Sequence, residues 1–375
     1  MNLSRTAVIL LCAIFIAGFA AGIEAAGDNA PPAQSTASVR AEDLLAVAFS
    51  LEDMRHLFRK PGFWWPSFPE FNTGLLPSKP GERLFVVQNF KRVGPDSGGE
   101  IENALILFDS DASARHALKE LAADDAGNSR KLDGPPLGDE SCYFSRFESD
   151  NMTPYSTTVR FRVGAVLVRL TLLREMAADS TDRLARYAAP IVDRAGALLK
   201  GELHATPIPA EISAHMPRTV PGMELLGATV IPVDAWALND TANDPLKIRG
   251  MLQGLGGREM GFARYRLQND PAQVVELTLF TFPHVKSATR WVREFIDDDN
   301  AGARLDAGRT GVLSAFVNRT VPPEGGGYEN MYELQFAKGT FVGDVSCYAP
   351  YAKTSSVCEE AVRELAESWF GELEK

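Results

Sequence analysis

Two stretches of the sequence, residues 104–127 and residues 276–302, follow the same pattern. Each begins as a strand with alternating apolar residues that ends in Leu-Phe, passes through a short cap, and continues as a helix that closes on acidic residues and Ala-Gly. Their helical parts carry apolar residues at the i, i+3, i+4, i+7 spacing of a helix face, with a constant offset of 174 residues, as between Ala114 and Ala288. The chain is therefore predicted to contain two copies of one structural unit.

The order of elements is also predicted to be the same in the two copies. In each copy, strand and helix patterns alternate as β-β-α-β-β-β-α, with short connections and hairpin turns. Such an order favours an antiparallel sheet with helices packed on one face. We therefore expect an α+β protein with two tandem similar domains, residues 41–202 for the first copy and residues 203–375 for the second.

Length and charge agree with this organisation and exclude one class of partner. At 375 residues the chain is long for one hydrophobic core and fits two. The formal net charge is -11, and Lys and Arg are spread along the sequence rather than clustered. Such a charge repels nucleic-acid phosphates and anionic lipid headgroups, so no nucleic-acid partner is expected.

The N-terminus has the layout of a secretory signal peptide, which we predict for residues 1–26. Arg5 precedes an uncharged apolar run over residues 7–23, and small residues follow. This run is at the lower edge of the length that spans a bilayer, so an uncleaved membrane anchor stays open. Residues 27–40, rich in Pro, Ala, Ser and Gln, are predicted to form a flexible tether. Either alternative places the folded part in an extracytoplasmic space, periplasmic or secreted.

Two of the remaining cysteines are predicted to form a disulfide. Cys347 ends a predicted strand and Cys358 lies in the first turn of the last predicted helix, so the chain must reverse between them. In the first copy the corresponding positions are Leu172 and Leu184, an apolar pair able to make the same contact without a covalent bond. Cys142 is left over, either as a small buried hydrophobic residue or as a reactive or intermolecular thiol.

Sequence motifs for the common enzyme and metal sites are absent. The sequence contains no GxSxG, HExxH, CxxC or P-loop motif, and the glycine-rich segment 254–259 precedes a strand rather than a helix. The acidic run 297–299 is contiguous, unlike an EF-hand loop, and fits a solvated helix end better than a weak cation site. The five histidines are scattered. We expect no catalytic residue, metal ion or cofactor, and a non-enzymatic protein is favoured over an enzyme.

An aromatic cluster in the first copy is the strongest candidate for function. Five aromatic residues lie within nine positions, among three prolines that block regular structure. They are Phe63, Trp64, Trp65, Phe68 and Phe71. Aromatic rings are costly to leave in water, so these either cover the first sheet or form a surface for a ligand or partner. We refer to these five residues as the aromatic loop.

The function predicted from these features is binding. A small apolar or amphiphilic ligand, or another envelope protein, is expected to meet the aromatic loop or a cleft between the copies. Two alternatives stay open. One is an extracytoplasmic hydrolase whose site is assembled from scattered acids, serines and histidines. The other is a structural module for envelope assembly.

Overall fold

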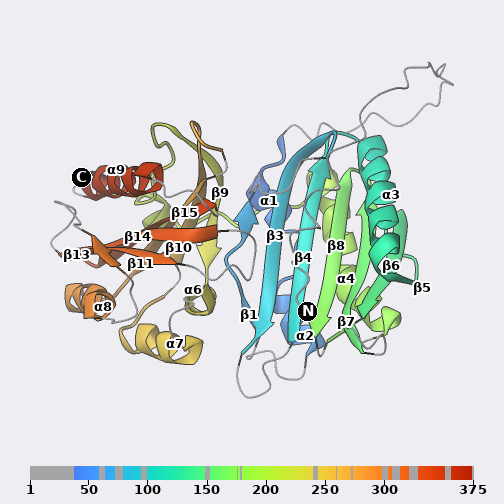
Figure 1. The fold of residues 1–375 in the computed structure, drawn as a ribbon, viewed down its shortest axis with the longest axis horizontal. Helices are drawn as coiled ribbons and strands as arrows, with labels where there is room; N and C mark the ends of the chain where they lie inside the picture. Colours follow the sequence, from blue (N-terminus) through green and yellow to red (C-terminus); the bar gives the residue numbers. More distant parts are fainter. Residues whose placement is uncertain are drawn as a thin grey trace, which may run out of the picture. The chain divides into compact units, whose positions relative to one another are not determined.

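The computed structural model describes most of the chain after residue 37 (Figure 1). The predicted signal peptide and most of the predicted tether lie outside the described residues. Those described are 38–58, 64–71, 79–93, 99–147, 153–174, 176–177, 180–239, 244–258, 260–271, 273–297, 303–305, 313–320, 328–350 and 356–373.

The first sheet is built from strands of the first half of the chain, and every recorded pairing in it is antiparallel. Its order is β1-β3-β4-β8-β7-β6-β5, with β2 paired to β3 beside β1. The strands are β1 (Trp64–Pro66), β2 (Glu70–Phe71), β3 (Glu82–Arg92), β4 (Gly99–Phe108), β5 (Arg130–Leu132), β6 (Glu140–Phe147), β7 (Pro154–Val163) and β8 (Val166–Arg174).

The second sheet is built from strands of the second half and is also antiparallel. Its order, read from the other edge, is β9-β10-β11-β15-β14-β13-β12. The strands are β9 (Met223–Ile231), β10 (Met260–Leu267), β11 (Val274–Thr281), β12 (Ala303–Leu305), β13 (Leu313–Thr320), β14 (Tyr328–Lys338) and β15 (Phe341–Pro350).

The two sheets have corresponding strand orders. The order β3-β4-β8-β7-β6-β5 in the first sheet matches the order β10-β11-β15-β14-β13-β12 in the second. In each half the matching hairpin turns at a glycine with positive φ, Gly164 (52°) and Gly339 (59°), a conformation that side-chain-bearing residues rarely adopt. The predicted α+β class, with two similar antiparallel sheets, is confirmed. At the corresponding edges, β5 and β12 are three-residue strands that are too short to show periodicity.

Two long helices of the first half begin at serine caps. Ser110 precedes α3 (Asp111–Asn128), and its side chain accepts a hydrogen bond from the Ser113 amide. Ser180 does the same for the Arg183 amide at the start of α4 (Thr181–Leu199). These caps satisfy amide groups that have no partner within the helix, so the strand-to-helix turns are fixed locally.

The helices cover both faces of the first sheet, where one face was expected (Figure 1). Leu167 of β8 packs in a cluster with α3, through Ala114 and Leu118. Its neighbours Val166 and Val168 point to the other face and belong to the cluster that contains α4. Because successive strand residues alternate between faces, α3 and α4 must lie on opposite sides. The expectation of helices on one face is therefore wrong.

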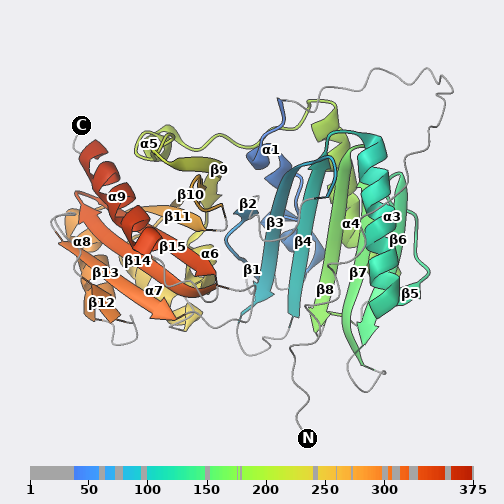
Figure 2. The same ribbon diagram turned by 45° about the horizontal axis from the view of Figure 1, so that its top comes forward.

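The second sheet is likewise covered on both faces (Figure 2). On one side α5 (Ala210–Ser213) and α9 (Ser356–Glu372) pack on Leu277 and Leu334. On the other, Phe280 packs with residues of α6 (Val233–Asn239), α7 (Pro245–Gly254) and α8 (Val285–Asp297). This second face carries the polar residues described below.

A short helix of the first half, α1 (Ala41–Leu45), contacts the second half directly. Glu42 and Asp43, in α1, accept hydrogen bonds of 2.9 Å from the amides of Ala228 and Ala205. The bond to Ala228 satisfies a donor on β9, which ends the second sheet. The next helix along the chain is α2 (Leu51–Leu57), and Ser50 caps its N-terminus. The first half thus covers an edge that is otherwise open to pairing.

A candidate binding site on the second sheet

Five buried side chains that are charged or carry an amide lie on the face of the second sheet that α6 and α8 cover. The strand register places Arg264 of β10 opposite Glu276 of β11, and Gln335 of β14 opposite Asp344 of β15. Glu333 lies two residues before Gln335 on β14, and therefore on the same face. We call these five residues the Asp344 cluster. They come from four neighbouring strands, so the sheet itself brings them together.

Hydrogen bonds join three members of the Asp344 cluster to one helix. The Gln335 amide Nε2 donates to Glu333 Oε1 at 3.0 Å and to Asp344 Oδ2 at 3.3 Å. Trp236 of α6 donates its indole Nε1–H to the same Asp344 oxygen at 3.3 Å. At the other end, Arg264 forms an ion pair with Glu276 at 3.3 Å. Asp344 is therefore the point where β14, β15 and α6 meet.

The Asp344 cluster is removed from solvent. Gln335 is 0% exposed and the other four members are 4–5% exposed. Buried polar atoms cost free energy unless they are hydrogen-bonded. Within the part of the chain that the structure describes, Gln335 Oε1 and the indole Nε1 of Trp291 make no hydrogen bond. These two buried atoms therefore lack the hydrogen bond that burial normally requires.

Aromatic rings border the Asp344 cluster. The rings of Trp236 and Trp291 meet edge to face at 5.3 Å, and the ring of Phe280 lies 5.4 Å from Trp236 and 5.8 Å from Trp291. Trp291 belongs to α8, so both covering helices contribute an indole. Carboxylates beside indole rings form an environment that favours positive charge.

The aromatic loop is placed elsewhere, and four of its five residues are buried. Trp64, Trp65, Phe68 and Phe71 are at most 9% exposed. Phe63 lies outside the described residues. The four rings belong to the hydrophobic cluster that spans both sheets. In this structure they pack against the protein rather than face solvent.

The contacts of the aromatic loop run to the second half of the chain. Trp65 lies under the guanidinium of Arg249, 5.0 Å from its ring centre, and the Phe68 ring lies 4.9 Å from that of Phe262. Phe71 packs so close to Gly227 of β9 that a Cβ there would meet its ring at 2.6 Å. These residues are therefore part of the contact between the halves, and their role in binding a ligand stays a prediction.

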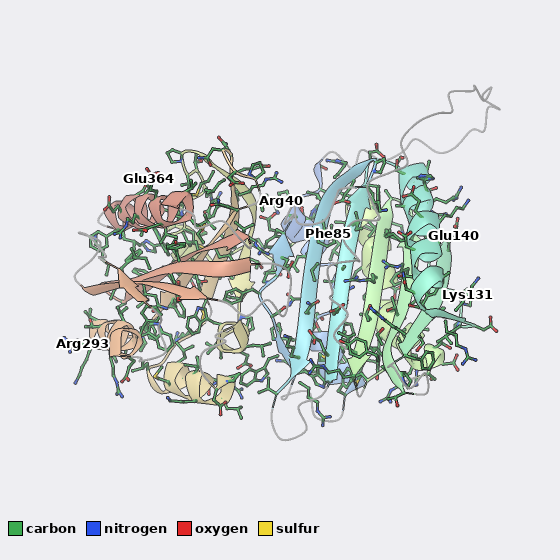
Figure 3. All side chains as sticks on the ribbon, viewed as in Figure 1. Arg40, Phe85, Lys131, Glu140, Arg293 and Glu364 are labelled. Atoms are coloured by element: carbon green, nitrogen blue, oxygen red, sulfur yellow. A yellow bond between two sulfur atoms is a disulfide. The ribbon has the colours of Figure 1, made fainter. Side chains whose placement is uncertain are left out.

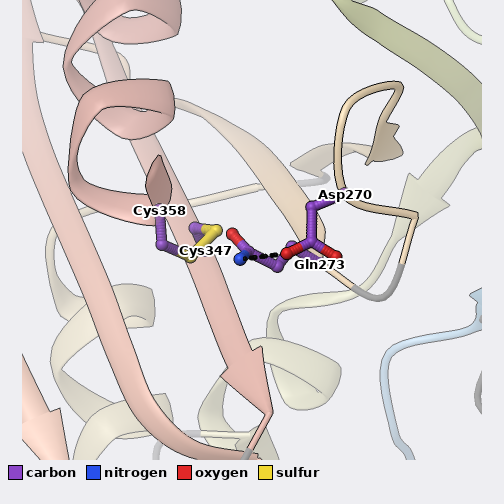
Figure 4. The surroundings of a disulfide bond; sticks show 4 residues. All are labelled: Asp270, Gln273, Cys347 and Cys358. Carbon is purple, nitrogen blue, oxygen red and sulfur yellow. Dashed lines mark hydrogen bonds between the residues drawn. A yellow bond between two sulfur atoms is a disulfide. The ribbon is translucent and has the colours of Figure 1, made fainter. Parts of the chain in front are cut away.

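The predicted disulfide between Cys347 and Cys358 is present and joins β15 to α9 (Figure 4). Both residues are fully buried among the apolar side chains of that face. Cys142 is a free thiol, half-buried beside the α3 cluster. Burial raises the pKa of Cys142 and so lowers its reactivity. A small hydrophobic role for Cys142 fits this environment.

Other classes of site find no support in the described ranges. Among those residues, no three His, Cys, Asp or Glu side chains are grouped so as to hold a metal ion. No helix of the described chain is long and apolar enough to cross a membrane. The ring of His215, one of the five scattered histidines, lies 4.4 Å from that of Phe341, tilted by 48°.

Comparison with known proteins gives little further information. No protein-family model matches this chain, and no curated protein matches it. Among solved structures, the chain is similar to the extracellular domain of PknH from Mycobacterium tuberculosis, with 15% sequence identity. The similarity covers 42% of this chain and 97% of that domain, with a TM-score of 0.32.

Sequence reasoning missed the Asp344 cluster because its members are far apart in the chain. The available signal was weak: Glu276 interrupts an apolar strand, and Asp344 lies between Gly343 and Val345 in another. A charged residue inside an apolar strand pattern is unusual, since buried charges must be paired. Only the strand register shows that these interruptions fall on one face.

Proposed function

We propose that this protein is an extracytoplasmic, non-enzymatic binding protein, built from two copies of one α+β unit, that holds a small ligand at the Asp344 cluster. The observation that carries the proposal is the buried Gln335 amide. It bridges two carboxylates through Nε2, while its Oε1 has no hydrogen-bond partner among the described residues. A buried acceptor in such a position costs about 1–3 kcal/mol unless something donates to it.

The location and the duplication have separate support. The disulfide between Cys347 and Cys358 is typical of an oxidising compartment, and the N-terminal sequence favours export. The corresponding strand orders of the two sheets support duplication. A polar site on one copy only is what a duplicated binding protein needs when a single ligand is bound per chain.

The proposal is tested with Gln335→Met, which removes the amide while keeping the length of the side chain. Thermal unfolding of the full chain is measured with a panel of small molecules of varied charge. We expect at least one compound to raise the Tm of the wild type with saturation. Its apparent affinity should be at least about tenfold weaker for Gln335→Met, the effect of losing about 1.4 kcal/mol.

Gln253→Met is the matched control, because Gln253 is exposed on α7 and the substitution is chemically identical. It should respond to the compound as the wild type does. If every stabilising compound acts equally on the wild type and on both variants, the Asp344 cluster is not a binding site. If no compound stabilises the wild type, the proposed function is wrong.

A further inference from the structure

We infer that α6 and α7 form a lid over the Asp344 cluster, which opens separately from the second sheet and which Trp65 of the first half holds closed. Both helices lie on the side of the sheet opposite α9 (Figure 1). They belong to the connection between β9 and β10, residues 232–259, whereas the corresponding connection of the first sheet, between β2 and β3, has only residues 72–81. The lid is therefore an addition to the second half that can move without displacing a strand.

The surface beneath the lid makes opening less costly than it would be on the other face. The same strands present apolar side chains such as Leu277 and Leu334 to α9, and present the Asp344 cluster to α6. Gln335 Oε1 and Trp291 Nε1, which lie beneath the lid, have no hydrogen bond within the described ranges. When the lid opens, water reaches these atoms and supplies the missing bonds. Opening thus recovers hydration that the closed state lacks.

The lid is built from short helices with ends suited to a hinge. α6 has seven residues and α7 has ten, and helices shorter than about 12 residues are marginal without outside contacts. At the end of α7, the Gly257 amide donates to the Leu252 carbonyl at 2.8 Å, and Gly256 has a φ of 79°. This arrangement closes the helix on itself before β10 begins. A change of direction at the glycines, and at Pro232 before α6, can therefore leave both helices intact.

Trp65 holds the lid through a single guanidinium. Arg249 of α7 lies over the Trp65 ring, 5.0 Å from its centre. The same guanidinium forms an ion pair with Asp234 of α6, with 2.8 Å between Nε and Oδ1. Trp65 is 1% exposed, and a cation over an indole ring is attracted more strongly where water is excluded. Through Arg249, one side chain of the first half therefore contacts the helix pair that covers the Asp344 cluster.

The neighbouring tryptophan supplies a matched control. Trp64 and Trp65 are successive residues of β1, and successive strand residues point to opposite faces. The Trp64 ring lies 5.2 Å from that of Phe58, and a Cβ on Gly99 would meet it at 2.9 Å. Both of these partners belong to the first half. Trp64→Leu therefore removes the same buried area from β1 as Trp65→Leu, without loosening the contact with Arg249.

Hydrogen exchange of the full chain, followed by mass spectrometry, tests the lid. No ligand is present, so the result does not depend on the proposed function. In the wild type, the amides of α6 and α7 should exchange at least about 100-fold faster than those of β11 and β15 beneath them. Trp65→Leu should speed exchange in both helices at least about tenfold further and leave β11, β15 and α9 unchanged. Trp64→Leu should leave the exchange of α6 and α7 as in the wild type.

Arg249→Met is a second variant, which removes the guanidinium and keeps the tryptophan, and it should act in the same direction as Trp65→Leu. Its control is Arg290→Met on α8, where the side chain is 63% exposed. If α6 and α7 of the wild type exchange as slowly as β15, the two helices are not a lid. If Trp65→Leu and Arg249→Met leave α6 and α7 unchanged, or speed exchange equally in β11, β15 and α9, Trp65 does not hold the lid and the inference is overturned.

Discussion

The hairpins β7–β8 and β14–β15 are equivalent in backbone but opposite in charge. In the first hairpin, Arg160 lies four residues before the turn glycine and Arg169 lies five residues after it. The strand register places these two arginines opposite each other. The second hairpin has Gln335 and Asp344 at the same places, also opposite each other. One backbone geometry therefore supports a basic pair in one half and an acidic site in the other.

The two pairs also differ in how their charges are satisfied. Arg160 forms an ion pair with Asp125 of α3, and Arg169 with Glu102 of β4, and both acids are partly exposed. Asp344, in contrast, is buried beneath Trp236. The first half thus neutralises its sheet face with nearby acids at the surface. This difference is the reason to place a binding site in the second half alone.

The opposite faces of the hairpins show a compensating exchange of size. Gly343 of β15 corresponds to Val168 of β8, and Trp369 of α9 corresponds to Ala195 of α4, at nearly the same sequence offset as between Ala114 and Ala288. A Cβ on Gly343 would lie 2.7 Å from the Trp369 ring and also meet the Phe336 ring, which packs on Trp369. The second half therefore has a small strand residue under a large helix residue, and the first half the reverse.

Breaking this exchange gives the largest effect we expect. Trp369→Ala removes a fully buried indole that packs edge to face on Phe336, and should lower the free energy of unfolding by about 3–5 kcal/mol. Gly343→Val alone should cost about 1–3 kcal/mol by overpacking. The double variant, which copies the first half, should cost less than the sum. Urea denaturation of the full chain measures all three.

If the losses in free energy of unfolding from Gly343→Val and Trp369→Ala simply add in the double variant, the exchange is contradicted. Additivity would mean that the side chains at these two positions do not occupy the same space. Leu373→Ala serves as a control for loss of an apolar side chain from the same helical end, since Leu373 is only partly buried. Its cost should be small and should add to that of Gly343→Val.

The corresponding hairpins of the two sheets and the disulfide were accessible from the sequence because both depend on local patterns. The alternation of β7 and the turn at Gly164 recur in β14 and at Gly339, and Cys347 and Cys358 lie on either side of one chain reversal. The use of both sheet faces was missed, although β8 carried the signal. Leu167 and its neighbours Val166 and Val168 form an almost continuous apolar run, which is typical of a strand buried on both sides.

The candidate site could not be derived from spacing. Glu276, Glu333 and Asp344 come together only because β11, β15 and β14 are neighbours in the sheet. The numbers of residues between them in the sequence depend on the lengths of the intervening loops, and no chemical motif fixes those lengths. The aromatic loop, by contrast, was conspicuous in composition, yet composition alone did not show that its rings pack between the halves. The aromatic loop, which stands out in the sequence, is therefore packed inside the protein, whereas the Asp344 cluster has no sequence motif that marks it.

Replacing the disulfide is expected to change the free energy of unfolding by an intermediate amount, and it also compares the two halves. Cys347→Ala with Cys358→Ala should lower the free energy of unfolding by about 3 kcal/mol, because the short loop between them is no longer closed in the unfolded chain. Leucine at both positions reproduces Leu172 and Leu184 of the first half and should recover part of the loss through packing. Denaturation with and without reductant measures both, and a wild type unaffected by complete reduction would show that the disulfide does not stabilise the fold.

Substitution of Arg162 tests how the charged face of the first sheet contributes to stability. The second half has Ala337 at the same position of its hairpin. The guanidinium is 3% exposed and donates to Asp111, to Asp139 at 3.1 Å and to Glu140 at 2.9 Å. Arg162→Met should lower the free energy of unfolding by about 2 kcal/mol, less than for a fully buried pair because the acids regain water. Arg115→Met is the control. Arg115 also bonds Glu140 but is about half exposed, so its loss should cost at most about 0.5 kcal/mol.

Acid should remove part of the Arg162 effect. Glu140 lies at the outer part of the first sheet near α3 (Figure 3), and the hydrogen bond from Arg162 holds its pKa below the ordinary value. A carboxyl with a lowered pKa in the folded state contributes stability above its unfolded pKa and loses it as the pH falls through the folded pKa. The difference between wild type and Arg162→Met should therefore be constant near neutrality and narrow by less than about 1 kcal/mol on acidification, since Glu140 is accessible to solvent. A difference that stays constant into acid would mean that Arg162 stabilises the sheet through its packed side chain rather than through its charge.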